Sequence, residues 1–135
     1  MRSRNNDACA MNGKRYLLDT NAVVALLRGD TQLLALLREA EWVGISIISQ
    51  IEFLAFSGLS QSDQTAFHAF AKRANVVGLT TESAQLIASI VNLRQQYRLK
   101  LPDAIIAASA LAERASLVTA DQQLQAIATL PIVRF

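Results

Sequence analysis

The sequence predicts a single α/β domain with a mostly parallel sheet covered by helices on both faces. Its 135 residues fit one domain and leave no room for a second. Apolar residues make up 52% of the chain and charged residues 18%, which excludes a disordered polypeptide. Short apolar runs alternate with longer helical patterns, and this alternation implies right-handed crossovers between parallel strands.

The N-terminal half predicts two strands, each followed by two helices. Strands are expected where a brief run is rich in Leu, Val or Ile, and helices where apolar residues recur at i, i+3 and i+4. By these criteria a strand at 15–19 precedes helices at 20–28 and 31–40, and a strand at 43–46 precedes helices at 48–57 and 63–74.

The C-terminal half continues the alternation. A strand at 75–79 precedes helices at 82–97 and 102–115, a strand at 117–119 precedes a short helix at 121–128, and a strand at 132–135 ends the chain. In the longest helix one apolar stripe is formed by Leu86, Ile90, Leu93 and Tyr97. Functional crevices in such sheets lie beyond the carboxyl ends of the strands.

Composition also excludes several kinds of site. Cys9 is the single cysteine and His68 the single histidine, which argues against a disulfide framework, a His/Cys zinc site and a His-dependent triad, and favours a cytoplasmic setting. The longest apolar run, 22–27, is far shorter than the ~18 residues of a membrane span. Residues 1–14 lack the apolar core of a secretory signal and are expected to be a flexible extension of a domain at 15–135.

Two aspartates stand at the end of a predicted strand or just beyond it. Asp19 ends the first strand in YLLDTNAVVALL, with Asn21 close behind, and Asp121 comes two residues after Thr119 in SLVTADQQLQAI. Each also suits the N-cap of the following helix. The Thr119 hydroxyl is placed to orient the Asp121 carboxylate, although a β-branched residue is common in strands for packing alone.

Two further acids stand in apolar helical segments. Glu52 lies in SIISQIEFLAF, where a buried, unpaired carboxylate is costly and calls for a cation, a metal or water; a partner arginine or a position at the rim is the alternative. Asp103 follows Pro102 in KLPDAIIAASALAE. Capping explains an aspartate there, but this small-residue helix is expected to press on the sheet, and its dipole to keep Asp103 ionised.

Convergence of these four acids at one crevice is the economical explanation in a chain of only 11 acidic residues. Gathered carboxylates repel one another unless a divalent cation neutralises them. Oxygen ligands without paired His or Cys select Mg²⁺ or Mn²⁺, and such an ion activates water toward a phosphodiester. With these acids neutralised, the remaining charge rises from +2 to about +6, which favours an anionic partner.

The same residues resemble the PIN-domain family, in particular its toxin branch, the VapC-like ribonucleases. The matching stretches, in order, are YLLDTNAVVALL, ISQIEF, LPDAIIAASA and LVTADQQL. The resemblance implies a three-layer α/β/α sandwich, a homodimer, a co-expressed antitoxin, and Mg²⁺- or Mn²⁺-dependent endoribonuclease activity that leaves a 5′-phosphate and a 3′-hydroxyl.

Carried over residue by residue, the resemblance implies that the catalytic and metal-binding acids are Asp19, Glu52, Asp103 and Asp121. It further implies polar support from Asn21 and Thr119. One departure follows the fourth acid, where many relatives carry another acid or Asn and this chain has Gln122 and Gln123. The choice between one metal ion and two stays open.

Three basic residues lead toward Asp103 and are candidates for gripping RNA phosphates. They are Arg94, Arg98 and Lys100, and phosphate contacts dominate nucleic-acid affinity. Basic residues in the last turn of a helix equally serve its C-terminal dipole. A catalytically silent PIN-like protein-binding module is the alternative to an enzyme. A receiver-like or dehalogenase-like domain fits less well, because Asp19 has no second acid beside it, and no P-loop motif is present.

Overall fold

Five parallel strands form one sheet with the order β3-β2-β1-β4-β5. The structure, a computed structural model, describes residues 14–135, so the extension expected at the N-terminus lies almost entirely outside the described residues. The strands are β1 (Arg15–Leu18), β2 (Trp42–Ser46), β3 (Asn75–Val77), β4 (Ser116–Thr119) and β5 (Ile132–Arg134). The parallel sheet confirms the predicted fold class.

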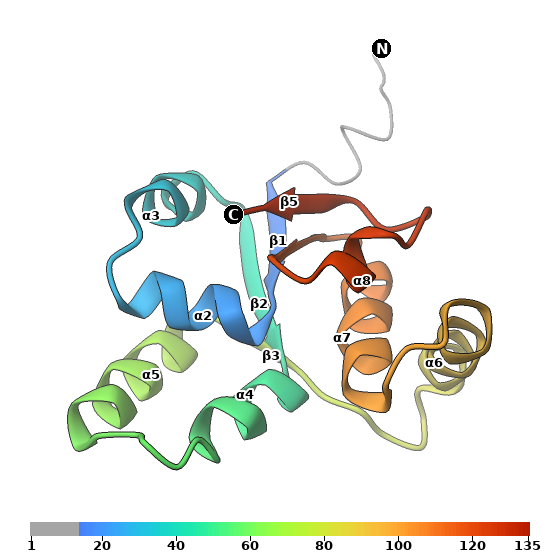
Figure 1. Ribbon diagram of the computed structural model, residues 1–135, viewed down its shortest axis with the longest axis horizontal. Helices are drawn as coiled ribbons and strands as arrows, with labels where there is room; N and C mark the ends of the chain where they lie inside the picture. The colour runs from blue at the N-terminus through green and yellow to red at the C-terminus, as the bar shows by residue number, and fades with distance from the viewer. Residues whose placement is uncertain (1–13) are drawn as a thin grey trace.

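Helices cover both faces of this sheet, which gives the three-layer α/β/α architecture. One layer holds α2 (Thr20–Leu27), α3 (Thr31–Arg38) and α5 (Gln61–Arg73). The opposite layer holds α6 (Ala84–Tyr97), α7 (Leu101–Ala112) and the short α8 (Gln122–Gln125). Helix α4 (Ile47–Leu54) follows β2 directly and lies at the lower end of the sheet in Figure 1.

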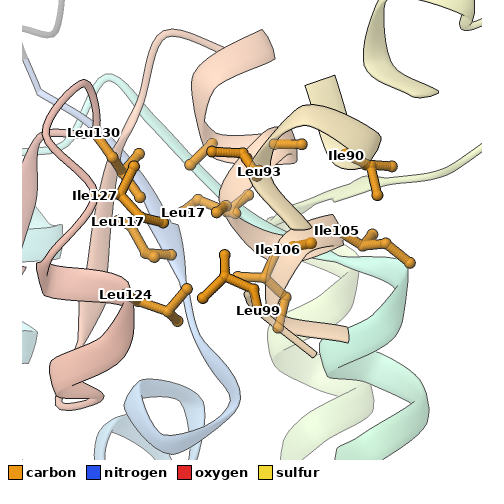
Figure 2. Packing of buried hydrophobic residues seen from close by; sticks show 14 of the residues in the cluster. Leu17, Ile90, Leu93, Leu99, Ile105, Ile106, Leu117, Leu124, Ile127 and Leu130 are labelled. Carbon is orange, nitrogen blue, oxygen red and sulfur yellow. The ribbon is translucent and has the colours of Figure 1, made fainter. Parts of the chain in front are cut away.

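Alternation along the strands divides the core into two clusters, one under each helical layer. Leu17 and Leu117 are fully buried in a cluster with α6, α7 and α8, where Figure 2 shows them beside the Ile and Leu side chains of those segments. Their neighbours Leu18 and Val118 are fully buried in the second cluster, with Val23 and residues of α3, α4 and α5. Burial on both faces explains why these strands are continuous apolar runs.

Several boundaries differ from the predicted ones for identifiable reasons. Helix α8 is half its expected length because Asp121 is its N-cap and the chain turns after Gln125. Helix α6 begins at Ala84, two residues later than expected, and ends as expected at Tyr97, beyond which Arg98 adopts a left-handed conformation with φ of 55°. Helix α7 ends at Ala112, and Arg114 is left-handed in the turn toward β4. Alternation and periodicity did not detect the turn after α7, because no glycine marks it.

The strand order places a topological switch point between β1 and β4. These neighbouring strands are paired in register, Leu18 opposite Val118, yet α2 leaves β1 toward one layer and α8 leaves β4 toward the other. The diverging connections leave space beyond the carboxyl ends of the two strands, which is where ligands bind in open α/β sheets. Within residues 14–135 no helix is long and apolar enough to cross a membrane.

Candidate functional site

Asp19 occupies the switch point itself. Its backbone amide donates to the Val118 carbonyl oxygen at 3.0 Å, which continues the β1–β4 ladder by one residue. Its Oδ1 accepts from the Thr20 amide at 2.7 Å, and Asp19 is the N-cap of α2. The predicted capping role of Asp19 is therefore confirmed. The side chain is nevertheless buried, with only 7% of the residue exposed.

Burial is the main cause that raises the pKa of the Asp19 carboxyl above its usual value. The hydrogen bonds from Thr119 and Thr20 act in the opposite direction, and the negative charges of Asp121 and Glu52 raise the pKa further. Burial and the neighbouring negative charges thus disfavour the ionised form of Asp19, and a bound cation would favour it.

The fully buried Thr119 at the end of β4 joins two of the predicted acids. Its Oγ1 donates to Asp19 Oδ2 at 2.7 Å and accepts from the Asp121 amide at 3.0 Å. Asp121 Oδ1 in turn accepts from the Gln123 amide at 2.8 Å and caps α8. The Thr119 hydroxyl therefore orients the carboxylate of Asp19. The sequence predicted that it would orient the carboxylate of Asp121, but its contact with Asp121 is to the backbone amide.

Glu52 lies at the rim of the site, and the expectation that its apolar neighbours bury it is wrong. Glu52 is exposed, as are Ile51 and Phe56 at 56% and 65%. The apolar residues around Glu52 thus belong partly to the surface of α4. Glu52 Oε1 accepts from Thr20 Oγ1 at 2.6 Å, and this bond ties the rim of α4 to the residue next to Asp19.

Asp103 lies in the first turn of α7 and is half-buried, and its carboxyl group interacts electrostatically with the other three acids. Burial raises the pKa of its carboxyl, the charges of Asp121, Asp19 and Glu52 raise it further, and only Lys100 lowers it. These causes act against the helix dipole, which favours the ionised form of an acid at a helix N-terminus. That the dipole keeps Asp103 ionised at neutral pH stays a prediction.

The four acids thus form one electrostatically coupled set around the carboxyl ends of β1, β2 and β4. Within residues 14–135 no three His, Cys, Asp or Glu side chains lie close enough to enclose a metal ion by themselves. Mg²⁺ is commonly held by one or two carboxylates and keeps several of its waters. All-oxygen donors, whose neighbouring charges raise the pKa values of Asp19 and Asp103, fit such a hard, hydrated ion.

The basic residues predicted to contact substrate surround the start of α7. Arg94 Nε donates to the Leu99 carbonyl oxygen at 3.2 Å and so holds the turn between α6 and α7. Arg98 and Lys100 lie in that turn and are exposed. The ion pairs of residues 14–135 are Lys14–Glu39 and Arg15–Glu113, which leaves these three cations outside any ion pair of that part of the chain.

A groove of about 400 Å³ opens beside the rim of the acidic site. Its lining includes Thr20, Asn21 and Glu52 together with Arg28 and Phe56. Asn21 is exposed at this position and has no hydrogen bond to the four acids within residues 14–135. The structure places it beside the site without showing a supporting role.

Two serines at the junction of β2 and α4 were not among the site residues predicted from the sequence. Ser46 ends β2 next to β1, is fully buried, and its Oγ accepts from the Ile48 amide at 3.1 Å as the N-cap of α4. Ser49, one turn later, is 1% exposed, and its hydroxyl has no hydrogen-bond partner among residues 14–135. The available signal was the recurrence of Ser46, Ser49 and Glu52 at every third residue, because i and i+3 share one face of a helix.

The sequence and the fold were compared with protein families, with curated proteins and with solved structures. The family model described as "PIN domain" matches residues 16–130, and no curated protein matches the sequence. A toxin-antitoxin complex from Klebsiella pneumoniae contains a chain with 28% identity and a TM-score of 0.72, over 87% of this chain and 96% of that one.

Two further structures share the fold. VapBC2 from Rickettsia felis bound to a promoter DNA fragment matches with 22% identity and a TM-score of 0.74, over 89% of this chain and 98% of that one. VapBC-1 from nontypeable Haemophilus influenzae matches with 23% identity and a TM-score of 0.68, over 88% and 96%. Since the family model spans nearly the whole described domain and the fold agrees, this chain belongs to the PIN-domain family.

Proposed function

We propose that this protein is a metal-dependent endoribonuclease that hydrolyses RNA phosphodiester bonds, and that it acts as the toxin of a toxin-antitoxin pair. The observation that carries the proposal is the coupled set of acids at the β1/β4 switch point, with the buried Asp19 at its centre. Burial together with the charges of Asp121 and Glu52 raises the pKa of Asp19. A fold gains nothing from placing like charges together, so a cationic ligand is the physical reason for the arrangement.

Each acid contributes differently to the proposed site. Asp19 is held rigidly because Thr20 and Thr119 each bond one of its carboxylate oxygens, and each oxygen retains a lone pair for a ligand. Asp103 has no hydrogen-bond donor within residues 14–135, so its carboxylate is free to turn toward a ligand. Glu52 at the rim reaches the solvent-exposed side.

Mg²⁺ or Mn²⁺ held by Asp19, Glu52, Asp103 and Asp121 would lower the pKa of a bound water and screen the charge that develops on the leaving oxygen. The carboxylates would position that ion, and the hydrogen bond from Thr119 keeps Asp19 from rotating away. Exposed Arg98 and Lys100 at the start of α7 are suited to bind the phosphates that flank the scissile bond.

The partners follow from the family and from the neighbouring structures. The Klebsiella neighbour is described as a toxin-antitoxin complex, which supports a cognate antitoxin for this chain. We also propose a homodimer, as the family resemblance implies. Co-purification of this protein with the product of an adjacent gene, and loss of RNA cleavage in that complex, would support the antitoxin assignment.

RNA cleavage by purified protein tests the enzyme assignment. Wild type should cleave RNA in Mn²⁺ or Mg²⁺, leave 5′-phosphate ends and stop in EDTA, and Asp19→Asn should lose the activity while keeping a native circular dichroism spectrum. Equal rates for wild type and Asp19→Asn would contradict the proposal. A folded wild type with no metal-dependent cleavage of any RNA would favour the alternative, a catalytically silent protein-binding module.

A further inference from the structure

The Ser49 hydroxyl is a buried polar group of the described chain that lacks a hydrogen-bond partner. Ser49 is 1% exposed and its Oγ has no partner. Leaving a hydroxyl unsatisfied in the interior is unfavourable, and a buried orphan donor therefore indicates a missing ligand or water. The other side chains of comparable burial do not share this feature; Ser109, also 1% exposed, donates to the Ile105 carbonyl oxygen at 2.7 Å.

Ser49 lies on the face of helix α4 that also carries Glu52. Successive residues of a helix are separated by 100°, which places Ser49 between Glu52 and Phe53 around the helix axis. On one side of this arc Ile48 packs on the cluster beneath α6 and α7, and on the other side Phe53 is buried in the cluster beneath α2 and α5. Between the two clusters lies the end of the sheet.

The residues one turn before and one turn after Ser49 lie at the end of β2 and at the rim of the acidic site. Ser46, one turn earlier, caps α4 where β2 ends beside β1. Glu52, one turn later, accepts from Thr20 Oγ1 beside Asp19. The buried face of α4 thus runs from the strand ends to the rim, with Ser49 between the two.

We propose that the Ser49 hydroxyl binds an ordered water at the floor of the acidic site and, through it, supports the hydration shell of the divalent ion. This inference rests on the proposed metal-dependent function. Because no three acids of the described residues 14–135 enclose an ion by themselves, waters must complete its coordination, and those waters need polar partners on the protein. Ser49 is a positioning residue in this arrangement, since it acts through water and touches neither the ion nor the RNA.

Metal binding without RNA provides the test. The Mn²⁺ concentration that gives half of the maximal rise in melting temperature should increase about tenfold in Ser49→Ala, as is typical when an outer-shell partner is removed. Ser109→Ala is the matched control, because it removes an equally buried hydroxyl whose bond is satisfied within α7, and it should leave that concentration unchanged. Ser49→Thr retains the hydroxyl and should restore binding.

Stability in EDTA separates this role from a structural one. Ser49→Ala should melt no lower than wild type without metal, since the hydroxyl it loses has no protein partner. A lower metal-free melting temperature, or a Mn²⁺ midpoint within twofold of wild type, would overturn the proposal, as would a wild type that Mn²⁺ does not stabilise. If Mn²⁺ binds as described but wild type cleaves no RNA, the nuclease assignment fails while the role of Ser49 stands.

Discussion

The substitution Thr119→Val probes the hydrogen bond that orients the central carboxylate. Valine keeps the β-branched shape of threonine in a fully buried position but removes the Oγ1 that donates to Asp19 Oδ2 at 2.7 Å and accepts from the Asp121 amide at 3.0 Å. A hydrogen bond to a charged group contributes about 1.5–3 kcal/mol to stability, and a neutral one about 1 kcal/mol. Valine recovers part of this loss through its additional apolar surface.

We therefore expect Thr119→Val to lower the free energy of unfolding by about 2 kcal/mol, which corresponds to a fall of roughly 8 °C in melting temperature for a domain of this size. The measurement is urea denaturation at neutral pH in EDTA, followed by the fluorescence of Trp42, the single tryptophan. The loss should shrink toward acidic pH. The Thr119 bond lowers the pKa of Asp19, so it stabilises the ionised carboxylate and its contribution fades as Asp19 is protonated.

Two controls make this prediction refutable. Thr119→Ser keeps the hydroxyl and should retain most of the stability. Thr65→Val removes a hydroxyl that donates to the Gln61 carbonyl oxygen on the exposed side of α5, and should change stability by less than about 0.5 kcal/mol. A Thr119→Val variant within that margin of wild type, or a Thr119→Ser variant as unstable as Thr119→Val, would refute the assigned role of this hydroxyl.

Three further outcomes are expected. Glu52→Gln should abolish Mn²⁺-dependent cleavage yet melt no lower than wild type in EDTA, because its amide oxygen can still accept from Thr20 Oγ1 and the removed charge relieves repulsion. Asp103→Asn should raise the urea midpoint at pH 7 in EDTA. Because the pKa of Asp103 is raised in the folded protein, its carboxyl group stabilises the fold below the pKa of the unfolded chain, and this stability is lost as the pH rises through the folded pKa. The gain from asparagine should therefore vanish toward pH 4. The double substitution Arg98→Ala with Lys100→Ala should raise KM for RNA several-fold with little effect on kcat, and reduce the salt dependence of binding.

Each of these outcomes has a contrary result. A Glu52→Gln variant that melts well below wild type would identify Glu52 as a structural residue. A pH-independent effect of Asp103→Asn would contradict the electrostatic origin of its pKa shift. For the basic pair, Lys72→Ala with Arg73→Ala at the end of α5 is the control, and an equal rise in KM there would indicate a diffuse charge effect.

The sequence alone determined the order and type of the elements and the positions of the aspartates at strand ends. These features depend on local patterns: apolar runs, helical spacing, and caps such as Asp19 and Asp121 immediately after a strand. Such patterns survive folding because backbone geometry and burial act on neighbours in the chain.

Only the tertiary structure decided how the acids relate to one another. The contact between Thr119 and Asp19 joins residues 100 positions apart, and the β1–β4 pairing that creates it is a long-range choice of sheet order. The exposure of Glu52 and the upward shift in the pKa of Asp103 also depend on what packs around α4 and α7. Apolar neighbours in sequence could not reveal that Ile51 and Phe56 face outward, nor that the Ser49 hydroxyl lies buried without a partner, because burial is a property of the assembled layers.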